Sequence, residues 1–112
     1  ASGNAVENWT STRDCGSFLS QVYAGTLVSK NASERMMQLL LGQTRRTKIP
    51  AGVPSGVKVA NKTGELAAVQ NDVAIVFGTH PYVLAVMSSD ISSAVAPSQI
   101  TELSRAVWDA AQ

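Results

Sequence analysis

Residues 57–65 read Val-Lys-Val-Ala-Asn-Lys-Thr-Gly-Glu, a β-rich run that leads into a cation, a hydroxyl and a glycine. Valine favours extended structure, so we expect Lys62, Thr63 and Gly64 to lie along a strand edge. There Lys62 would attract an anion, Thr63 would supply a hydrogen bond, and Gly64 would leave room for an extended ligand. The stretch therefore predicts a binding edge for an anionic ligand that carries a carbonyl group.

Two further strands are expected after this stretch, with short connections between them. Residues 72–78 are almost entirely apolar, which is typical of a central strand, and residues 82–87 follow after a turn at residues 79–81. Short connections favour antiparallel pairing of neighbouring strands. We therefore expect an antiparallel meander in which residues 57–63 form the first strand.

Amphipathic segments on either side of the strands predict three helices. The first follows a cap within residues 10–12 and ends at Gly25, the second starts at a cap on Asn31 and ends at Gly42, and the third opens at residues 97–98. Helical spacing predicts the buried positions. These are Cys15, Phe18, Leu19, Val22 and Tyr23 in the first helix, Met36, Met37, Leu40 and Leu41 in the second, and Ile100, Leu103, Val107 and Ala110 in the third.

The order of elements predicts an α+β fold, a three-stranded antiparallel sheet with flanking helices. Residues 1–112 are enough for one compact domain and show no internal boundary, so we interpret them as a single partial domain. Helices on one face would leave the other face uncovered, although an all-apolar central strand needs cover on both. We therefore expect the open face to pair with a missing N-terminal part or with a second copy of the chain.

Composition excludes several classes of function. The net charge is +1 and no basic block occurs, so we expect neither nucleic acid nor an anionic membrane as a partner. No apolar run is long enough to span a bilayer, and residues 1–10 do not resemble a signal peptide. Cys15, the single cysteine, is expected in the core, and His80 in an exposed turn, so no disulfide, metal site or cofactor is implied. The charged residues 43–48 are expected to form a solvated loop.

The same residues carry a resemblance to a known family. Lys62-Thr63-Gly64 is one of three motifs of the serine β-lactamase and penicillin-binding-protein superfamily. Similar stretches occur in the family's order at residues 10–14, 49–54, 71–76, 82–87 and 98–111. The chain therefore resembles the C-terminal part of a class A serine β-lactamase-like protein.

The resemblance implies a function for the parent protein and a role for each motif residue. The parent would hydrolyse β-lactam amides through an acyl-enzyme, or bind a cell-wall peptide, on the outer side of the cytoplasmic membrane as a secreted, periplasmic or lipid-anchored protein. Lys62 would give electrostatic and proton-relay support, while Thr63 and Gly64 would contact the substrate. The backbone amide of Glu65 would face the oxyanion, and Arg13 would grip the substrate carboxylate.

The nucleophile is not expected within this chain. Ser55-Gly56-Val57-Lys58 fits the Ser-x-x-Lys pattern, but it runs from a turn into a strand, where the first and fourth side chains point to opposite faces. Ser89-Asp90-Ile91 only approaches the Ser-Asp-Asn motif, and it follows the third strand instead of preceding the first. Alone, the chain should therefore be inactive, with no catalytic residue of its own.

Two interpretations of function stay open, beside a chance match in an unrelated α+β domain. In the first, the chain is the C-terminal fragment of a class A β-lactamase-like hydrolase and carries its substrate-binding strand. In the second, it is a non-catalytic β-lactamase-like module for a cell-wall peptide or a protein partner. Glu65 favours the second interpretation, because a carboxylate beside the site would repel the carboxylate of a substrate.

Overall fold

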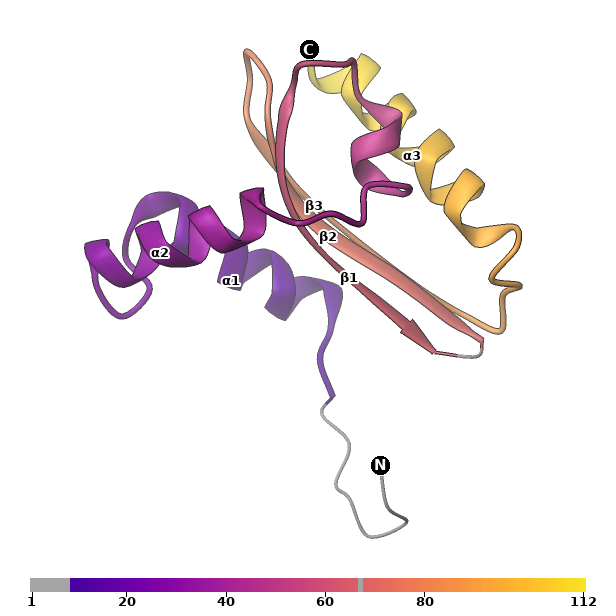
Figure 1. Ribbon diagram of the computed structural model, residues 1–112, viewed down its shortest axis with the longest axis horizontal. Coiled ribbons are helices and arrows are strands. Elements are labelled where there is room, and N and C mark those ends of the chain that lie inside the picture. The colour runs from indigo at the N-terminus through magenta and orange to yellow at the C-terminus, as the bar shows by residue number, and fades with distance from the viewer. Residues whose placement is uncertain (1–8, 67) are drawn as a thin grey trace, which may run out of the picture.

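A computed structural model describes residues 9–66 and 68–112, and these residues form an α+β fold as predicted (Figure 1). The elements follow one another as α1 (Thr12–Ala24), α2 (Lys30–Leu41), the 3₁₀-helix η1 (Ile49–Gly52), β1 (Lys58–Leu66), β2 (Val69–Phe77), β3 (Tyr82–Ser89) and α3 (Ala96–Ala111). Among the described residues, no helix has the length and apolar character needed to cross a membrane.

The three strands form the predicted antiparallel meander, in the order β1-β2-β3. The central position of β2 is confirmed, and the segment from Ala74 to Val76 is at most 1% exposed. The register places Lys62 opposite Val73. Within the described residues, the outer edges of β1 and β3 have no neighbouring strand. The Lys-Thr-Gly motif therefore lies on an edge strand.

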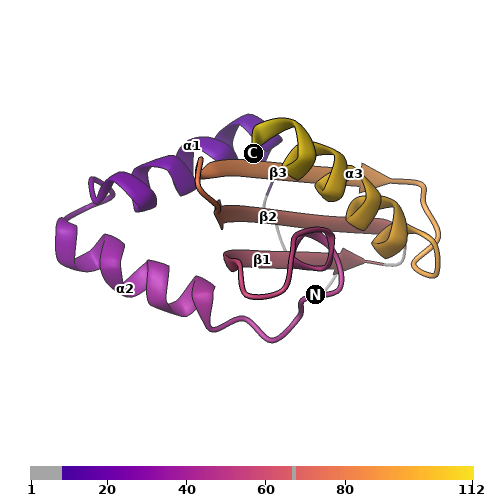
Figure 2. The same ribbon diagram turned by 90° about the horizontal axis from the view of Figure 1, so that it is seen from above.

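Both faces of the sheet are covered, so the prediction of an uncovered face is wrong. α1 and α2 pack on one face, where Leu19 meets Ala60 and Ile75. η1 and α3 pack on the opposite face, where Ile49 and Ile100 meet Val59, Ala74 and Val76 (Figure 1). Figure 2 shows η1 over β1 and α3 over β3. The chain itself thus provides the two-sided cover that an apolar central strand needs.

The helix boundaries follow from capping side chains. Ser11 caps α1 as predicted and accepts a hydrogen bond of 3.1 Å from the backbone three residues along. Gly25 ends the helix with a left-handed φ of 75°. Ser29, not Asn31, caps α2 with a similar hydrogen bond of 3.0 Å. The predicted cap at Asn31 is wrong because a serine two residues earlier makes the cap.

The buried faces of α1 and α2 are narrower than the sequence pattern predicts. In α1, Leu19 and Val22 are buried, whereas Phe18 and Tyr23 are 43% and 52% exposed. Cys15 is half-buried, so its predicted place in the core is wrong. In α2, all four predicted apolar positions are only half-buried. These two helices meet the sheet along one line instead of a broad face, and the rest of their apolar surface stays accessible.

α3 packs closely on η1 through small residues. Ile100 is buried as predicted, but Leu103 is 46% exposed and Ser104 takes the buried position beside Ile100. The Ser104 hydroxyl donates to the Ile49 carbonyl at 2.8 Å. A Cβ on Gly52 would lie 2.6 Å from the Ser104 Cβ. The short distance between helix and turn thus requires a glycine and a serine, which apolar periodicity cannot predict.

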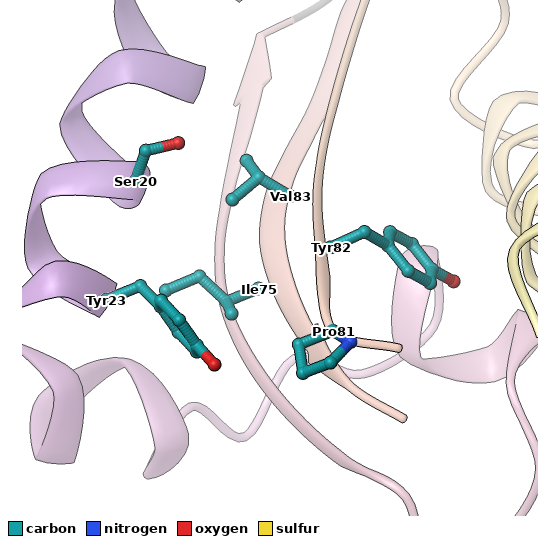
Figure 3. A pocket seen from close by; sticks show the side chains of 6 residues that line it. All are labelled: Ser20, Tyr23, Ile75, Pro81, Tyr82 and Val83. Carbon is teal, nitrogen blue, oxygen red and sulfur yellow. The ribbon is translucent and has the colours of Figure 1, made fainter. Parts of the chain in front are cut away.

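A small hollow lies between α1 and the ends of β2 and β3 (Figure 3). It has a volume of about 260 Å³ and is lined by Ser20, Tyr23, Ile75, Pro81, Tyr82 and Val83. Its lining includes no residue of the Lys-Thr-Gly motif within the described part of the chain. The fold therefore separates this hollow from the motif strand.

Candidate functional site

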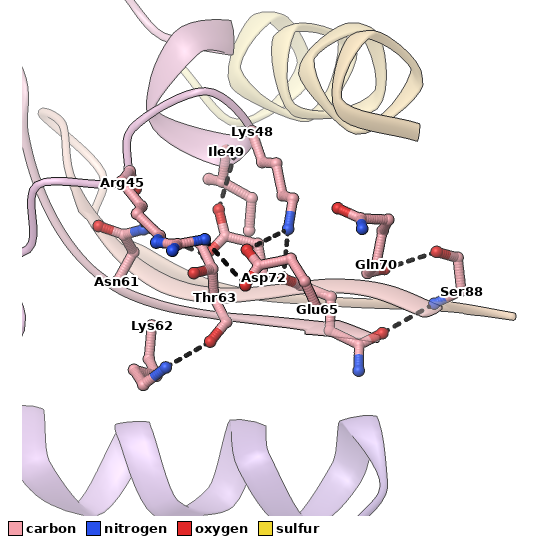
Figure 4. A network of polar contacts seen from close by, with 11 residues as sticks. Arg45, Lys48, Ile49, Asn61, Lys62, Thr63, Glu65, Gln70, Asp72 and Ser88 are labelled. Atoms are coloured by element: carbon pink, nitrogen blue, oxygen red, sulfur yellow. Dashed lines mark hydrogen bonds and ion pairs between the residues drawn. The ribbon is translucent and has the colours of Figure 1, made fainter. Parts of the chain in front are cut away.

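Successive side chains of the motif strand point to opposite faces of β1. Lys62 lies on the face of α1 and lines a hollow of about 480 Å³ between the helices and the sheet. Asn61, Thr63 and Glu65 lie on the face of η1, opposite Lys62 (Figure 4). The alternation follows from the two-residue period of a strand. As a result, the Lys62 ammonium and the Thr63 hydroxyl do not share one face.

The hollow beside Lys62 is formed by α1, α2 and the sheet. Its lining residues are Thr10, Asp14, Cys15, Phe18, Leu19, Leu40, Lys62 and Val73. The Thr10 hydroxyl and the Cys15 thiol lie 3.4 Å apart at its α1 side. Lys62 is exposed, and its ammonium donates to the Thr63 carbonyl. The motif lysine is thus accessible above a largely apolar hollow.

The backbone of β1 presents polar groups along its open edge. The carbonyls of Val59 and Thr63 accept hydrogen bonds from side chains, that of Val59 from Arg46 Nη1 at 3.4 Å. These carbonyls therefore point away from β2. In an antiparallel strand every second residue points its backbone groups the same way, which extends this direction to Glu65. The Glu65 N–H is accordingly placed where an extended ligand could add as a further strand.

Gly64 meets no packing requirement within the described part of the chain. A Cβ added there would have the Asn71 Cβ as its nearest neighbour, at 3.9 Å, which is an ordinary van der Waals contact. By contrast, a Cβ on Gly52 would lie 2.5 Å from the Thr101 carbonyl oxygen. A side chain at Gly64 would project from the same face of β1 as Lys62, and it would not disturb the fold.

Lys48 lies buried behind the motif, so the prediction of a solvated loop is wrong at this residue. Lys48 is 2% exposed, because it directly precedes the buried turn η1. Its ammonium lies 2.8 Å from Glu65 Oε1 and donates to the Asn71 carbonyl at 3.2 Å (Figure 4). Arg45 Nη1 lies 3.3 Å from the other oxygen, Oε2, of Glu65. Two cations from the loop therefore hold the carboxylate that follows the motif.

The charge of Glu65 is stabilised and directed away from Lys62. The hydrogen bond from Lys48 lowers the pKa of Glu65, with further lowering by the Thr63 hydroxyl and by Arg45, while partial burial acts in the opposite direction. The sequence predicts that this carboxylate repels an anionic ligand. In the fold, its pairing with Lys48 and Arg45 offsets that repulsion.

Asp72 and Asn61 join the loop to the back of the motif strand. Asp72, opposite Thr63 in the register, is fully buried and accepts from the Ile49 N–H at 2.9 Å and from Asn61 Nδ2 at 3.2 Å. Burial raises the pKa of Asp72, while both hydrogen bonds act in the opposite direction. Asn61 also donates to the Arg45 carbonyl at 3.1 Å. In the sequence, Asn61 and Asp72 are polar residues within apolar strand segments, and this feature could have indicated the network.

Two other candidate features from the sequence lie apart from the motif. Arg13 is exposed in the first turn of α1 and is not among the residues that line the hollow beside Lys62. Ser55 lies in a turn and Lys58 is the first residue of β1, so this Ser-x-x-Lys sequence is not on a helix. This placement agrees with the interpretation of the Ser-x-x-Lys match as a coincidence.

Comparison with known proteins establishes the family. A model of the Beta-lactamase enzyme family matches residues 1–111. The chain belongs to the beta-lactamase enzyme family. A search of curated proteins found no match for this beta-lactamase family chain.

Solved structures agree with this family and show how much of the fold the chain contains. PBP-A is 26% identical with a TM-score of 0.85, over 96% of this chain and 46% of PBP-A. A beta-lactamase from Sphaerobacter thermophilus is 25% identical with a TM-score of 0.88, over 95% of this chain and 42% of that one. A PBP-A mutant solved as an acyl-enzyme complex with penicillin G is 27% identical with a TM-score of 0.83, over 90% and 39%. The chain spans less than half the length of these proteins.

Proposed function

We propose that this chain supplies the substrate-binding strand of a penicillin-recognising serine hydrolase, whose nucleophile belongs to polypeptide outside the 112 residues. The observation that carries the proposal is the open edge of β1, which combines the accessible ammonium of Lys62 with outward backbone groups at Thr63 and Glu65. Family membership and the acyl-enzyme of a PBP-A mutant support this reaction class. By itself the chain would not form an acyl-enzyme.

Each residue of the edge has a separate task in the proposed reaction. The Lys62 ammonium would raise the positive potential for an anionic ligand and favour deprotonation of a serine from the rest of the protein. Gly64 would let the ligand lie close to the strand. The Glu65 N–H would donate to the oxyanion that forms during acyl transfer. For the Thr63 hydroxyl to reach a ligand, the packing around this buried residue, which is 5% exposed, would have to open.

The proposed ligand is a β-lactam or a cell-wall peptide. A protein with such a ligand works outside the cytoplasmic membrane, so we expect the parent to be secreted, periplasmic or lipid-anchored.

The missing part of the protein is the proposed partner of this chain. The outer edge of β3, which has no neighbouring strand within the described residues, offers it a place to extend the sheet.

Labelling with a penicillin tests the proposal. The product of the complete reading frame would be incubated with a fluorescent penicillin and examined by intact mass. We expect an acyl adduct on the wild type and a labelling rate about 100-fold lower in Lys62→Met. Lys58 is an exposed cation at the start of the same strand, so Lys58→Met should label at nearly the wild-type rate. Absence of an adduct on the complete protein, or equal labelling of both variants, would reject the proposal.

One observation favours a second candidate, a non-catalytic β-lactamase-like module that binds a cell-wall peptide or protein partner. The Glu65 carboxylate is already paired with the cations of Lys48 and Arg45 beside the open edge of β1. Occupied cations would weaken the capture of a carboxylate substrate. In the same labelling experiment, reversible penicillin binding without an adduct supports this second function.

A further inference from the structure

The contacts of Glu65 are those of a carboxylate in a binding site. One carboxylate oxygen lies 2.8 Å from Lys48 Nζ and the other lies 3.3 Å from Arg45 Nη1 (Figure 4). The Lys48 side chain is 3% exposed and that of Arg45 is 70% exposed. One cation thus forms the floor of the site and the other forms its open rim.

The donors of this site are held in place by groups other than Glu65. Lys48 also donates to the Asn71 carbonyl at 3.2 Å. The next residue, Ile49, is anchored through its N–H to the buried Asp72 at 2.9 Å. The Arg45 carbonyl accepts a hydrogen bond from Asn61 at 3.1 Å. These bonds would keep the Lys48 ammonium and the backbone of Arg45 beside β1 if the Glu65 side chain left.

Glu65 itself is in a position from which its side chain can leave. Its side chain is 31% exposed, and the following residue, Leu66, is 70% exposed at the end of β1. Rotation about the side-chain bonds would move the carboxylate into water without breaking the strand pairing. The departing carboxylate would leave two cations, one of them almost fully buried, and such a charge requires a counter-ion.

We propose that Lys48 and Arg45 form a carboxylate-binding site beside the Lys-Thr-Gly edge, and that Glu65 fills this site as a built-in ligand. The incoming ligand is a molecule that carries a carboxylate, and it competes with Glu65 for both cations. The identity of the natural ligand rests on the proposed function, whereas the existence of the carboxylate-binding site does not. Glu65 thereby competes with an anionic ligand by occupying the site, and does not act by repelling it. The ligand must bind the two cations more tightly than Glu65 does.

Chemical rescue with acetate tests the site. The full chain with Glu65→Ala would be unfolded by heat in sodium acetate and in sodium chloride of equal ionic strength at pH 7. Because Lys48 loses its counter-ion, we expect the variant to melt about 10–15 °C below the wild type in chloride. Acetate should restore at least half of this loss. If the variant is unfolded in chloride, acetate-induced folding followed by circular dichroism replaces the melting temperature.

Two controls separate specific rescue from a general salt effect. The wild type keeps Glu65 in the site, and the double variant Lys48→Met with Glu65→Ala lacks the buried cation, so acetate should not stabilise either of them relative to chloride. Equal stabilisation of all three proteins by acetate, or no rescue of Glu65→Ala, would overturn the proposal. Rescue in a protein that forms no penicillin adduct would uphold this site and reject only the proposed hydrolase.

Discussion

Lys48 and Glu65, which are 17 residues apart in the sequence, form an ion pair with Nζ 2.8 Å from Oε1. The pair joins the loop before η1 to the residue that follows the Lys-Thr-Gly motif. Its two members differ in environment, because the Lys48 side chain is 3% exposed and that of Glu65 is 31% exposed. The difference makes the consequences of removing each partner unequal.

Removing Glu65 should destabilise the fold more than removing Lys48. Glu65→Ala leaves a buried ammonium unpaired, and we expect it to lower the free energy of unfolding by about 3 kcal/mol. Lys48→Met replaces the buried cation by an apolar side chain of similar length, and Glu65 keeps Arg45, so we expect a loss of about 1 kcal/mol or less. Urea unfolding of both variants measures the difference. Equal losses that add up in the double variant would contradict the pairing.

Stability at acid pH should depend on Glu65. The pKa of Glu65 is lowered in the fold from its ordinary value of 4.5, so the carboxylate holds its proton less tightly when folded than when unfolded. Its contribution to stability is therefore present above pH 4.5 and is lost as the pH falls through the lowered value. The difference in free energy of unfolding between the wild type and Glu65→Gln should shrink below that pH. A difference that stays constant from pH 7 to about pH 3 would contradict this.

Asp72 should act on stability in the opposite sense. Burial raises the pKa of Asp72 above its ordinary value of 3.8, so the folded protein holds this proton more tightly than the unfolded chain. Stability is then lost as the pH rises from 3.8 to the raised value. Compared with Asp72→Asn, the wild type should gain stability as the pH is lowered towards 3.8. Urea titrations of both proteins at a series of pH values would show parallel curves if this interpretation is wrong.

Val28 should be a position where a substitution stabilises the protein. It has a positive φ of 63°, which is unfavourable for a β-branched residue, and it is 89% exposed. Asparagine tolerates this conformation, so Val28→Asn should raise the free energy of unfolding by about 1 kcal/mol. Val28→Thr, which keeps a β-branched side chain at the same positive φ, is a matched control. Thermal unfolding of Val28→Asn and Val28→Thr should show a gain only in the first.

Gly64 and Gly52 should differ in what a side chain disturbs. Gly64→Ala adds a methyl group on the Lys62 face of the edge strand and should change the free energy of unfolding by less than about 1 kcal/mol, while lowering the rate of penicillin labelling of the complete protein. Gly52→Ala places a Cβ 2.5 Å from the Thr101 carbonyl and should cost about 3 kcal/mol. Unfolding measurements distinguish the two. A large stability loss in Gly64→Ala would show that packing, and not ligand access, requires that glycine.

Local sequence rules are enough to predict the elements of this fold. Short turns between apolar runs indicate the meander, Ser11 and Gly25 delimit α1, and the resemblance at Lys62-Thr63-Gly64 identifies the family that the comparison confirms. These features depend on neighbours within a few residues or on a short motif, so one chain is enough to recognise them.

The sides and partners of the motif residues depend on tertiary packing. Tertiary packing decides which helices cover which face of the sheet. The burial of Lys48 and its pairing with Glu65 require the loop before η1 to fold back onto β1. A charged loop is hydrated by default, and long-range contacts such as the anchoring of Ile49 on Asp72 draw its last lysine inside. That contact joins positions 23 residues apart, a separation at which no periodic pattern in the sequence operates.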